Sequence, residues 1–315
     1  MAFEVSTQDA LTLQAFSSTE NAFLFSCRPF ALAVIMLAAC APSREPQPSA
    51  QSDDFGDPIS FGGRPSRIVS LNPATTDLLF ALGAGARLVG RTHWDLYPDS
   101  AKFVPDMGSG LRPNIEAVLG ARPDLVVLYA SQDNRNAATQ FRAAGVNTIS
   151  LKIDHIADFH RASVLLGRII GDSIRGQVVS DSVARTIDRV VNATKALKKP
   201  RVFWHIWDAP LITIAAGSYL HELIVIAGGE NVYGELPDPS PTVSIEDVLR
   251  RNPDYFITGP EGAIKVRGDA RWAAAPAVKA GRILIADTIL VGRPSVRLGE
   301  AAVSLAALLH PGALR

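Results

Sequence analysis

Two glutamates occupy the same place in a short phrase that the sequence contains twice. The phrase reads NIEAVLGARPDL from Asn114 to Leu125 and SIEDVLRRNPDY from Ser244 to Tyr255, and six of its twelve positions are identical. Glu116 and Glu246 are therefore matched carboxylates on two units built on one plan. Two such carboxylates are either a pair that docks onto the cations of a partner or a coincidence of sequence.

The residues around the glutamates predict a helix in both copies. Asn114 and Ser244 are good N-cap residues, which puts each glutamate in the first turn of its helix, and Pro123 and Pro253 end the helices. An acid in a first turn is common and stabilises its helix by only about 0.3–1 kcal/mol. Either glutamate alone is explained by this effect, so the pairing is what favours docking.

A second candidate chemistry is direct metal binding. It would need imidazole and carboxylate ligands that converge, and candidates occur in both halves of the chain. These candidates are His93, Asp95, His205, Asp208 and His221. None of them has close ligand spacing such as HxH or HxxxH, so we expect most of them to be ordinary polar residues and predict no metal site.

Catalysis finds no support in the motifs. A GxSxG elbow is absent, Ser218 in AAGSYLH being its nearest approach, and neither a Walker P-loop nor a GxGxxG fingerprint occurs. We therefore expect a binding protein rather than an enzyme.

The elements that would position these residues alternate between strand and helix in two stretches of similar length. RIVSL from Arg67 and LVVLYA after Pro123 indicate buried parallel strands in residues 53–152, and RVFWHIW, YFITG and RILIAD indicate the same in residues 200–315. This pattern predicts two α/β lobes with mostly parallel sheets and a ligand cleft between them.

Residues 153–199 differ, because strand-like runs give way to two helical stretches that break at Gly171 and Asp172. The second stretch, Ser173 to Leu197, would be roughly 35 Å long. We expect it to join the lobes as a rigid helix.

Composition narrows the function classes. The chain has 315 residues, of which 47% are hydrophobic and 20% charged, as in a soluble globular protein of about two domains. Because 31 basic residues balance 31 acidic ones, no electrostatic footprint for nucleic acid is present.

The N-terminal segment resembles a bacterial lipoprotein signal. The apolar run from Phe30 leads to Leu-Ala-Ala-Cys ending at Cys40, and it is too short for the roughly 20 residues that span a bilayer. We expect residues 1–40 to be the signal segment, Cys40 to be lipidated, and residues 41–52 to be a disordered tether. Acidic residues are unusual in a signal segment, so we also expect translation to start downstream of Met1.

Most of the folded chain, from about residue 53 to 311, resembles the helical-backbone solute-binding proteins of ABC importers. The resemblance rests on RIVSLNPATTDLLFALG, NIEAVLGARPDLVVL, LIVIAGGENVYG, VSIEDVLRRNPDYFITG and WAAAPAVKAGRILIAD. It implies a monomeric class III periplasmic-binding-protein fold, no cofactor, and a location at the cell envelope. It also implies that Glu116 and Glu246 dock onto arginines of a homodimeric permease that works with an ATPase.

The resemblance further implies a metal chelate as ligand, which is cobalamin, a ferric siderophore or haem, and it is strongest to the cobalamin receptors. Aromatic side chains line the cleft of those receptors. The corresponding candidates here are Trp94, Tyr129, Trp204 and Trp207, together with His93 beside the ligand metal. Core packing is the equally weighted alternative for Trp204, and Trp272 is expected in the core.

The chain departs from the cobalamin receptors at two places, so the identity of the ligand stays undecided. The chain has Gly110 and Leu111 before the first phrase and Ser240 before the second, where the cobalamin receptors carry aromatic residues. The alternative is that arginines border the cleft and bind a siderophore or haem propionates. The candidates are Arg112, Arg293 and Arg297. A surface capture or sensor lipoprotein without an importer is a further alternative.

Overall fold

The structure is a computed structural model that describes residues 51–59 and 63–314. The predicted signal segment, Cys40 and nearly all of the predicted tether lie outside the described residues. The first described residues were expected to form a turn and a short strand. They form a turn with a single bridge between Ser52 and Pro58, because the Asp53 carboxylate accepts hydrogen bonds from the N–H groups of Phe55 and Asp57.

The first lobe is built on a four-stranded parallel sheet in the order β2-β1-β3-β4. The strands are β1 (Ile68–Leu71), β2 (Leu88–Gly90), β3 (Leu125–Tyr129) and β4 (Asn147–Leu151), and the helices are α1 (Pro73–Ala81), α2 (Ile115–Gly120) and α3 (Arg135–Ala143). Strands β1 and β3 pair from Ile68 with Leu125 to Leu71 with Leu128. All their residues are buried except the half-buried Tyr129 at the end of β3, as expected for parallel strands covered on both faces.

The second lobe repeats this plan with a parallel sheet in the order β10-β9-β5-β8. Its strands are β5 (Arg201–Trp204), β8 (Glu230–Asn231), β9 (Tyr255–Thr258) and β10 (Ile283–Ile285), and the antiparallel hairpin is β6 (Trp207–Asp208) and β7 (Leu211–Ile212). The helices are α6 (Tyr219–Ile226), α7 (Ile245–Arg251), α8 (Pro260–Gly268), α9 (Pro276–Lys279) and α10 (Thr288–Val291). The two sheets confirm the predicted fold class.

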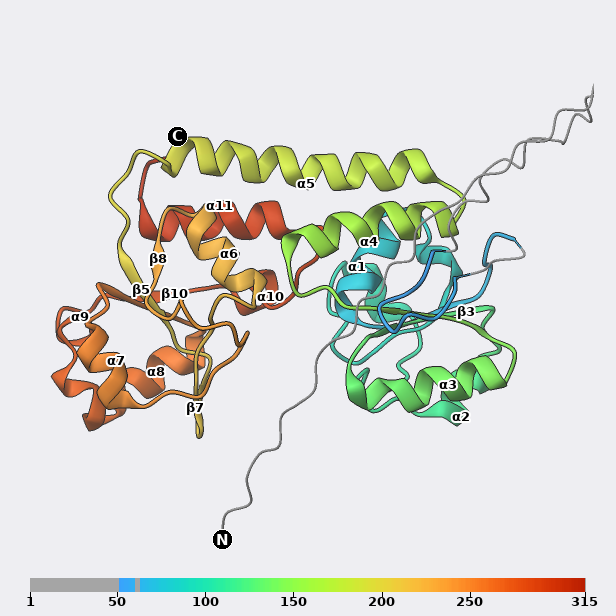
Figure 1. Cartoon of the computed structure of the whole chain (residues 1–315), viewed down its shortest axis with the longest axis horizontal. Helices are drawn as coiled ribbons and strands as arrows, with labels where there is room; N and C mark the ends of the chain where they lie inside the picture. Colours follow the sequence, from blue (N-terminus) through green and yellow to red (C-terminus); the bar gives the residue numbers. More distant parts are fainter. Residues whose placement is uncertain (1–50, 60–62, 315) are drawn as a thin grey trace, which may run out of the picture. The chain divides into compact units, whose positions relative to one another are not determined.

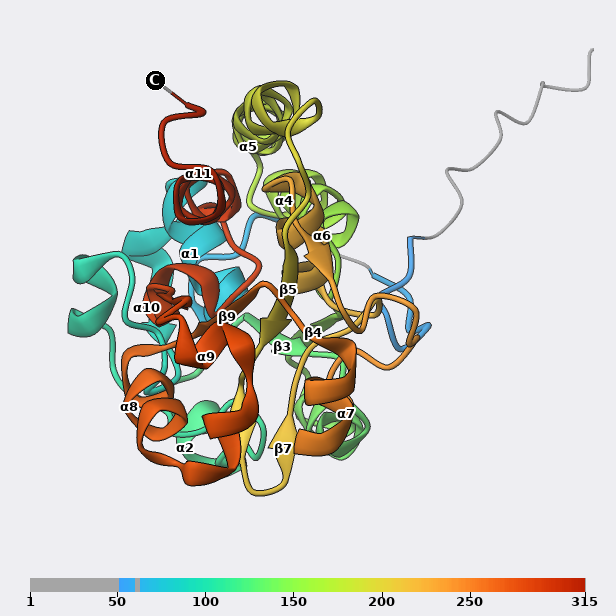
Figure 2. The same ribbon diagram turned by 90° about the vertical axis from the view of Figure 1, so that its left-hand side faces the viewer.

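Three helices form a layer along both lobes, which we call the helical layer. They are α4 (Ile156–Ile169), α5 (Ser173–Thr194) and α11 (Leu298–Leu309). Helix α5 has 22 residues and is therefore about 33 Å long, and it packs on α4 and on α11 (Figure 1). Figure 2 shows the three helices stacked at one side of the sheets. This is the long helix that the sequence predicts.

Two glycines allow α4 and α5 to approach at backbone distance. A Cβ atom at Gly167 would lie 2.7 Å from the Cα atom of Gly176, and one at Gly176 would lie 2.7 Å from the carbonyl oxygen of Ser163. Neither neighbour is a flexible side chain that could move aside. The two helices are therefore fixed against each other.

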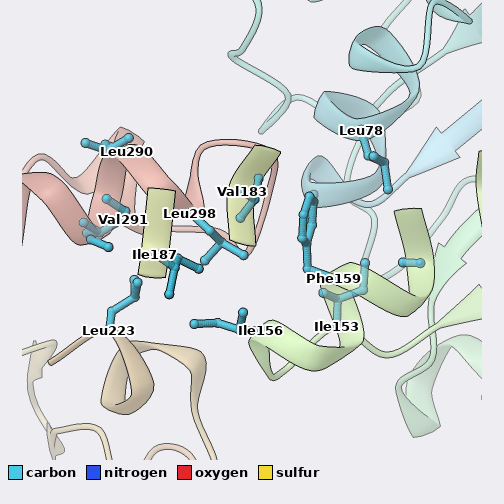
Figure 3. Packing of buried hydrophobic residues seen from close by; sticks show 14 of the residues in the cluster. Leu78, Ile153, Ile156, Phe159, Val183, Ile187, Leu223, Leu290, Val291 and Leu298 are labelled. Carbon is cyan, nitrogen blue, oxygen red and sulfur yellow. The ribbon is translucent and has the colours of Figure 1, made fainter. Parts of the chain in front are cut away.

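A single hydrophobic core continues from one lobe to the other through the helical layer (Figure 3). Leu78 comes from α1 and Phe159 from α4, while Val183 and Ile187 come from α5 and Leu298 from α11. Because these side chains are buried together, separating the lobes at this side would expose a large apolar area.

Each lobe also has its own smaller core on the other face of its sheet. In the first lobe this core is mostly aliphatic, with Leu71, Leu128 and Phe141. In the second lobe Phe203, Phe256 and Trp272 pack with ring centres 5.1–5.9 Å apart. The prediction that Trp272 belongs to the core is confirmed.

Candidate functional site

A cleft of about 550 Å³ lies between the two lobes. The first lobe and the segment after β4 contribute Asn72, Pro73, Ala74, Trp94, Leu96, Tyr129, Ile153 and Asp154, and the second lobe contributes Tyr219, Thr288, Ile289, Gly292, Arg293 and Pro294. We call this space the cleft. It has the size of a site for a small ligand and is lined from both sides.

Strand ends and helix starts place the lining residues. Tyr129 is the last residue of β3, and Asn72 directly follows β1 and caps α1, where its side chain accepts a hydrogen bond from the N–H of Ala74. Tyr219 and Thr288 are the first residues of α6 and α10. The cleft therefore lies at the carboxyl ends of the parallel strands, where ligands of open α/β sheets bind.

Tyr129 is held in place by a carboxylate of the same cleft. Its phenol donates a hydrogen bond of 2.6 Å to Oδ1 of Asp154. Burial, and then this bond and the charge of Asp154, raise the pKa of the Tyr129 phenol above its usual range. The side chain therefore stays neutral and presents an aromatic surface rather than a phenolate.

The mouth of the cleft is apolar. Trp94 is 60% exposed and has Leu96 beside it, and Ile289 is exposed in the lining from the opposite lobe. The ring of His93 lies 4.7 Å from that of Trp94, centre to centre, outside the cleft lining. An exposed indole opposite an exposed aliphatic side chain suits a large flat ligand with hydrophobic faces.

Two buried carboxylates, Asp77 and Asp95, lie behind the lining. Arg293 reaches from the loop after α10 to Asp77 on α1, with Nη1 and Oδ1 3.6 Å apart. Burial raises the pKa of the Asp77 carboxyl to about 7, although the charge of Arg293 counteracts it. Asp95 is also buried, and burial raises its pKa too, but its carboxylate accepts hydrogen bonds from Thr76 and Thr92 at 2.8–2.9 Å.

The structure brings together only part of the predicted ligand set. Trp94 and Tyr129 both line the cleft. Trp204 is 3% exposed and packs in the core that joins the lobes, so the packing alternative holds and its ring is no part of the cleft. The sequence places Trp204 in a strand but does not give the burial of the face on which it lies.

The other predicted residues lie beside the cleft. Trp207 is 56% exposed on the β6 hairpin, where it lines a neighbouring hollow with the Lys265 ammonium 5.5 Å from its ring centre. Arg297 stacks 4.7 Å from the ring centre of Tyr97 and donates a hydrogen bond of 2.9 Å to Glu300. Arg112 is exposed outside the cleft, whereas Arg293 lines it.

The sequence did not predict several residues in the lining or behind it. Asp154 and Tyr219 meet across the lobes, where the Tyr219 N–H donates to the carbonyl oxygen of Asp154 at 2.7 Å. Asp154 lies just beyond the carboxyl end of β4, a position that could have flagged it. The only sequence signal for Asp77 is that a charged residue occurs in the middle of an apolar helix, where it is buried.

The histidine and carboxylate candidates do not converge on a metal site. Within residues 51–59 and 63–314, no group of three or more potential His, Cys, Asp or Glu ligands occurs. His205 Nε2 lies 2.9 Å from Asp208 Oδ1, and the other oxygen of Asp208 accepts from Lys265 at 2.8 Å. A lysine thus provides the positive charge beside this carboxylate.

The two phrase helices have the predicted caps. Asn114 accepts from the N–H of Ala117, and Ser244 from that of Asp247, both at 3.1 Å. Both glutamates are exposed, and Figures 1 and 2 show α2 and α7 at the side of the two lobes away from α5. Hydrogen bonding from its own N–H and then from Ser244 lowers the pKa of Glu246.

Comparison with known proteins connects this geometry to one family. The model of a family described as periplasmic binding protein matches residues 68–290. A cobalamin-binding protein of Halobacterium salinarum is 28% identical, with 89% of this chain and 82% of that protein covered. A Bacillus subtilis protein named uncharacterized ABC transporter substrate-binding lipoprotein YvrC is 25% identical, with 89% and 95% covered.

A solved structure has the same fold. The periplasmic heme-binding protein RhuT from Roseiflexus sp. RS-1 superposes with a TM-score of 0.72 at 23% identity, covering 80% of this chain and 100% of that one. None of the helices in the described part of the chain has the length and apolar character needed to cross a membrane.

Proposed function

Since this chain belongs to the periplasmic binding protein family, we propose that it captures a metal chelate for an ABC importer and that this ligand is cobalamin. Members of the family are extracytoplasmic receptors that bind a solute and hand it to a transporter. Some relatives are named for cobalamin, and one structural neighbour is named for haem. The candidate ligands are therefore a corrinoid, haem and a siderophore. The residues that line the cleft support one of these ligands over the others.

The observation that supports cobalamin as the ligand is the pair of aromatic residues in the cleft. Trp94 is exposed at its mouth, and Tyr129 is fixed by its bond to Asp154. Both rings can stack on the face of a corrin, and this contact needs no ionisation of the phenol, whose pKa burial and Asp154 raise. Haem and anionic siderophores are the second candidates, favoured by Arg293 in the lining.

Titration of the full chain in detergent with cyanocobalamin, haemin and a panel of ferric siderophores tests the ligand. Calorimetry should give saturable one-to-one binding of cyanocobalamin, with quenching of tryptophan fluorescence. The Trp94→Ala variant should lose about 1–3 kcal/mol of binding free energy, because the indole contributes contact area to the ligand. Trp207→Ala, which removes a similarly exposed indole outside the cleft, is the matched control.

Binding of haemin or a siderophore alone would transfer the assignment to the second candidates. Equal losses from the two tryptophan variants would contradict the role of Trp94, and no binding by any compound would contradict a metal chelate as ligand.

The docking role of the two glutamates is a separate part of the proposal. Two exposed carboxylates on capped helices, one on each lobe, match a two-fold permease that presents arginines at a fixed spacing. Charge reversal of both, Glu116→Arg with Glu246→Arg, should abolish ligand uptake by cells and leave binding to the purified protein unchanged. Glu261→Arg, in the first turn of α8, is the control because it has the same helix position elsewhere.

Unchanged uptake in the double variant would remove the docking role. It would favour a capture or sensor lipoprotein that does not serve an importer.

The proposed anchor is a lipid on Cys40. The similarity to a protein named as a lipoprotein supports it. Cys40→Ser should release the protein from the membrane fraction, and mass spectrometry should find the mature N-terminus at a lipidated Cys40. We expect the receptor to be a monomer, which light scattering on the purified chain would test.

A further inference from the structure

The ion pair between Arg293 and Asp77 joins the two lobes behind the cleft. Asp77 belongs to α1 of the first lobe, and Arg293 belongs to the loop after α10 of the second. Arg293 lines the cleft, and its side chain is 13% exposed, whereas Asp77 is 1% exposed. The cation thus lies between a buried carboxylate and the space for the ligand.

The pair is incompletely bonded. Its closest atoms are 3.6 Å apart, which is too long for a hydrogen bond. Both oxygens of Asp77 and Nη1 of Arg293 are buried without a hydrogen-bond partner among the described residues. Asp95 provides the contrast, since three hydrogen bonds satisfy its carboxylate nearby. A buried carboxylate without hydrogen bonds is costly to keep ionised.

The groups that face Asp77 leave Arg293 as its one close counter-charge in the described chain. The Ser295 side chain lowers the pKa of the carboxyl by a polar contact, although no hydrogen bond of ordinary length joins them; Asp95 raises this pKa, and the charge of Arg297 lowers it least. Arg297 is already engaged by Glu300 and by the ring of Tyr97. Any second anion that reaches Arg293 from the cleft therefore competes with Asp77.

We propose that Arg293 and Asp77 form an exchangeable ion pair: an anionic group at the edge of the bound chelate replaces Asp77 as the partner of Arg293, and Asp77 takes up a proton from solvent. This inference rests on the proposed receptor function, and it applies to the candidate ligands with an anionic edge, which are haem and the anionic siderophores. The O–H bond of the Asp77 carboxyl is the one covalent bond formed, and the proton for it comes from the buffer.

Repulsion is the reason for the coupling. Two carboxylates near one guanidinium destabilise each other, and the buried one is the more easily neutralised. Because the pKa of Asp77 is already raised to about 7, its protonation near neutral pH costs little. A ligand with an uncharged edge leaves the pair intact and takes up no proton.

The consequence is a pH dependence that distinguishes ligands by charge. Above about pH 7 the affinity for an anionic chelate should fall by about tenfold per pH unit, since each binding event then consumes one proton. Below that pH it should level off. The affinity for a neutral chelate should not follow this curve.

The test compares two corrinoids that differ in one group. Cyanocobalamin is the neutral probe, and its derivative with one peripheral propionamide replaced by a propionate is the anionic probe, whose carboxyl stays ionised at pH 6–8. Calorimetry of the full chain in two buffers of different ionisation enthalpy counts the protons taken up at pH 8. Haemin, which carries two propionates, is measured in the same way.

We expect about one proton per bound anionic probe at pH 8, and about none for cyanocobalamin. Asp77→Asn, which keeps the shape of the side chain, should abolish the uptake and bind the anionic probe about tenfold more tightly than the wild type at pH 8. Arg293→Gln, which removes the cation, should bind the anionic probe no more tightly than cyanocobalamin at pH 6. Asp95→Asn, a change at the neighbouring buried carboxyl, should leave the proton uptake as it is.

Binding of an anionic probe without proton uptake, or with equal uptake in Asp77→Asn, would overturn the exchange while leaving the receptor function standing. Failure of all three compounds to bind the wild type would overturn the proposed function and this inference with it.

Discussion

The two lobes meet in two regions that differ in chemistry. Along the helical layer the contact is apolar and continuous, with Leu78, Phe159, Val183 and Leu298 in one core. Around the cleft it includes an incompletely bonded ion pair, Arg293 with Asp77. Close-packed apolar side chains and touching helix backbones resist sliding, whereas a long ion pair can exchange partners. One junction thus combines an apolar part that resists movement with an ion pair that, under the proposed exchange, would respond to the ligand.

Removing a ring from the helical layer should have the largest effect. Phe159→Ala deletes a fully buried side chain from the shared core and should lower the free energy of unfolding by about 3–5 kcal/mol. Urea denaturation measures it. Phe103→Ala is the control, because that ring is 90% exposed. A loss below about 1 kcal/mol for Phe159→Ala would show that the layer is not a close-packed junction.

The cleft side should respond to pH instead. A carboxyl whose pKa is raised from 3.8 to about 7 in the folded chain binds its proton more tightly when folded, so its contribution to stability is lost as pH rises from 4 to 7. Asp77→Asn lacks this loss. Between pH 4 and pH 8 the free energy of unfolding of this variant should therefore rise by up to about 4 kcal/mol relative to that of the wild type. Parallel stability curves for the two proteins would contradict the raised pKa.

A smaller effect should come from the contact of α4 with α5. Gly176→Ala puts a methyl group 2.7 Å from the carbonyl oxygen of Ser163, and should cost about 1–3 kcal/mol. Gly120→Ala, in α2, meets no atom within 4 Å and should be neutral or slightly stabilising. Thermal unfolding of both variants compares them. Equal melting temperatures would show that the two helices can separate without loss.

Local patterns were sufficient to predict much of the fold. Asn114 and Ser244 cap their helices through hydrogen bonds to residues three positions further along the chain. The apolar composition of IVSL and LVVL predicts that these strands are buried. Short-range hydrogen bonds and apolar runs are properties of a segment, so the sequence contains them. The resemblance to a family then supplied the way in which the segments assemble.

The site was less predictable because it depends on contacts distant in sequence. Trp94 and Trp204 are both tryptophans near strand ends, yet one is exposed in the cleft and the other is buried. The pKa of Asp77 is raised only because the folded chain buries this carboxyl, and Arg293 opposes the rise only because it approaches from the other lobe. Neither burial nor that approach can be read from the residues around Asp77.

The rigid helical layer also has a consequence for avidity. If the lobes hold a constant spacing, engagement of Glu116 raises the local concentration of Glu246 at its own partner site, so two weak contacts act as one strong one. A partner with a different spacing gains only a single weak contact. Under the proposed docking role, the rigid helix α5 would therefore restrict binding to partners whose two sites match the spacing of Glu116 and Glu246.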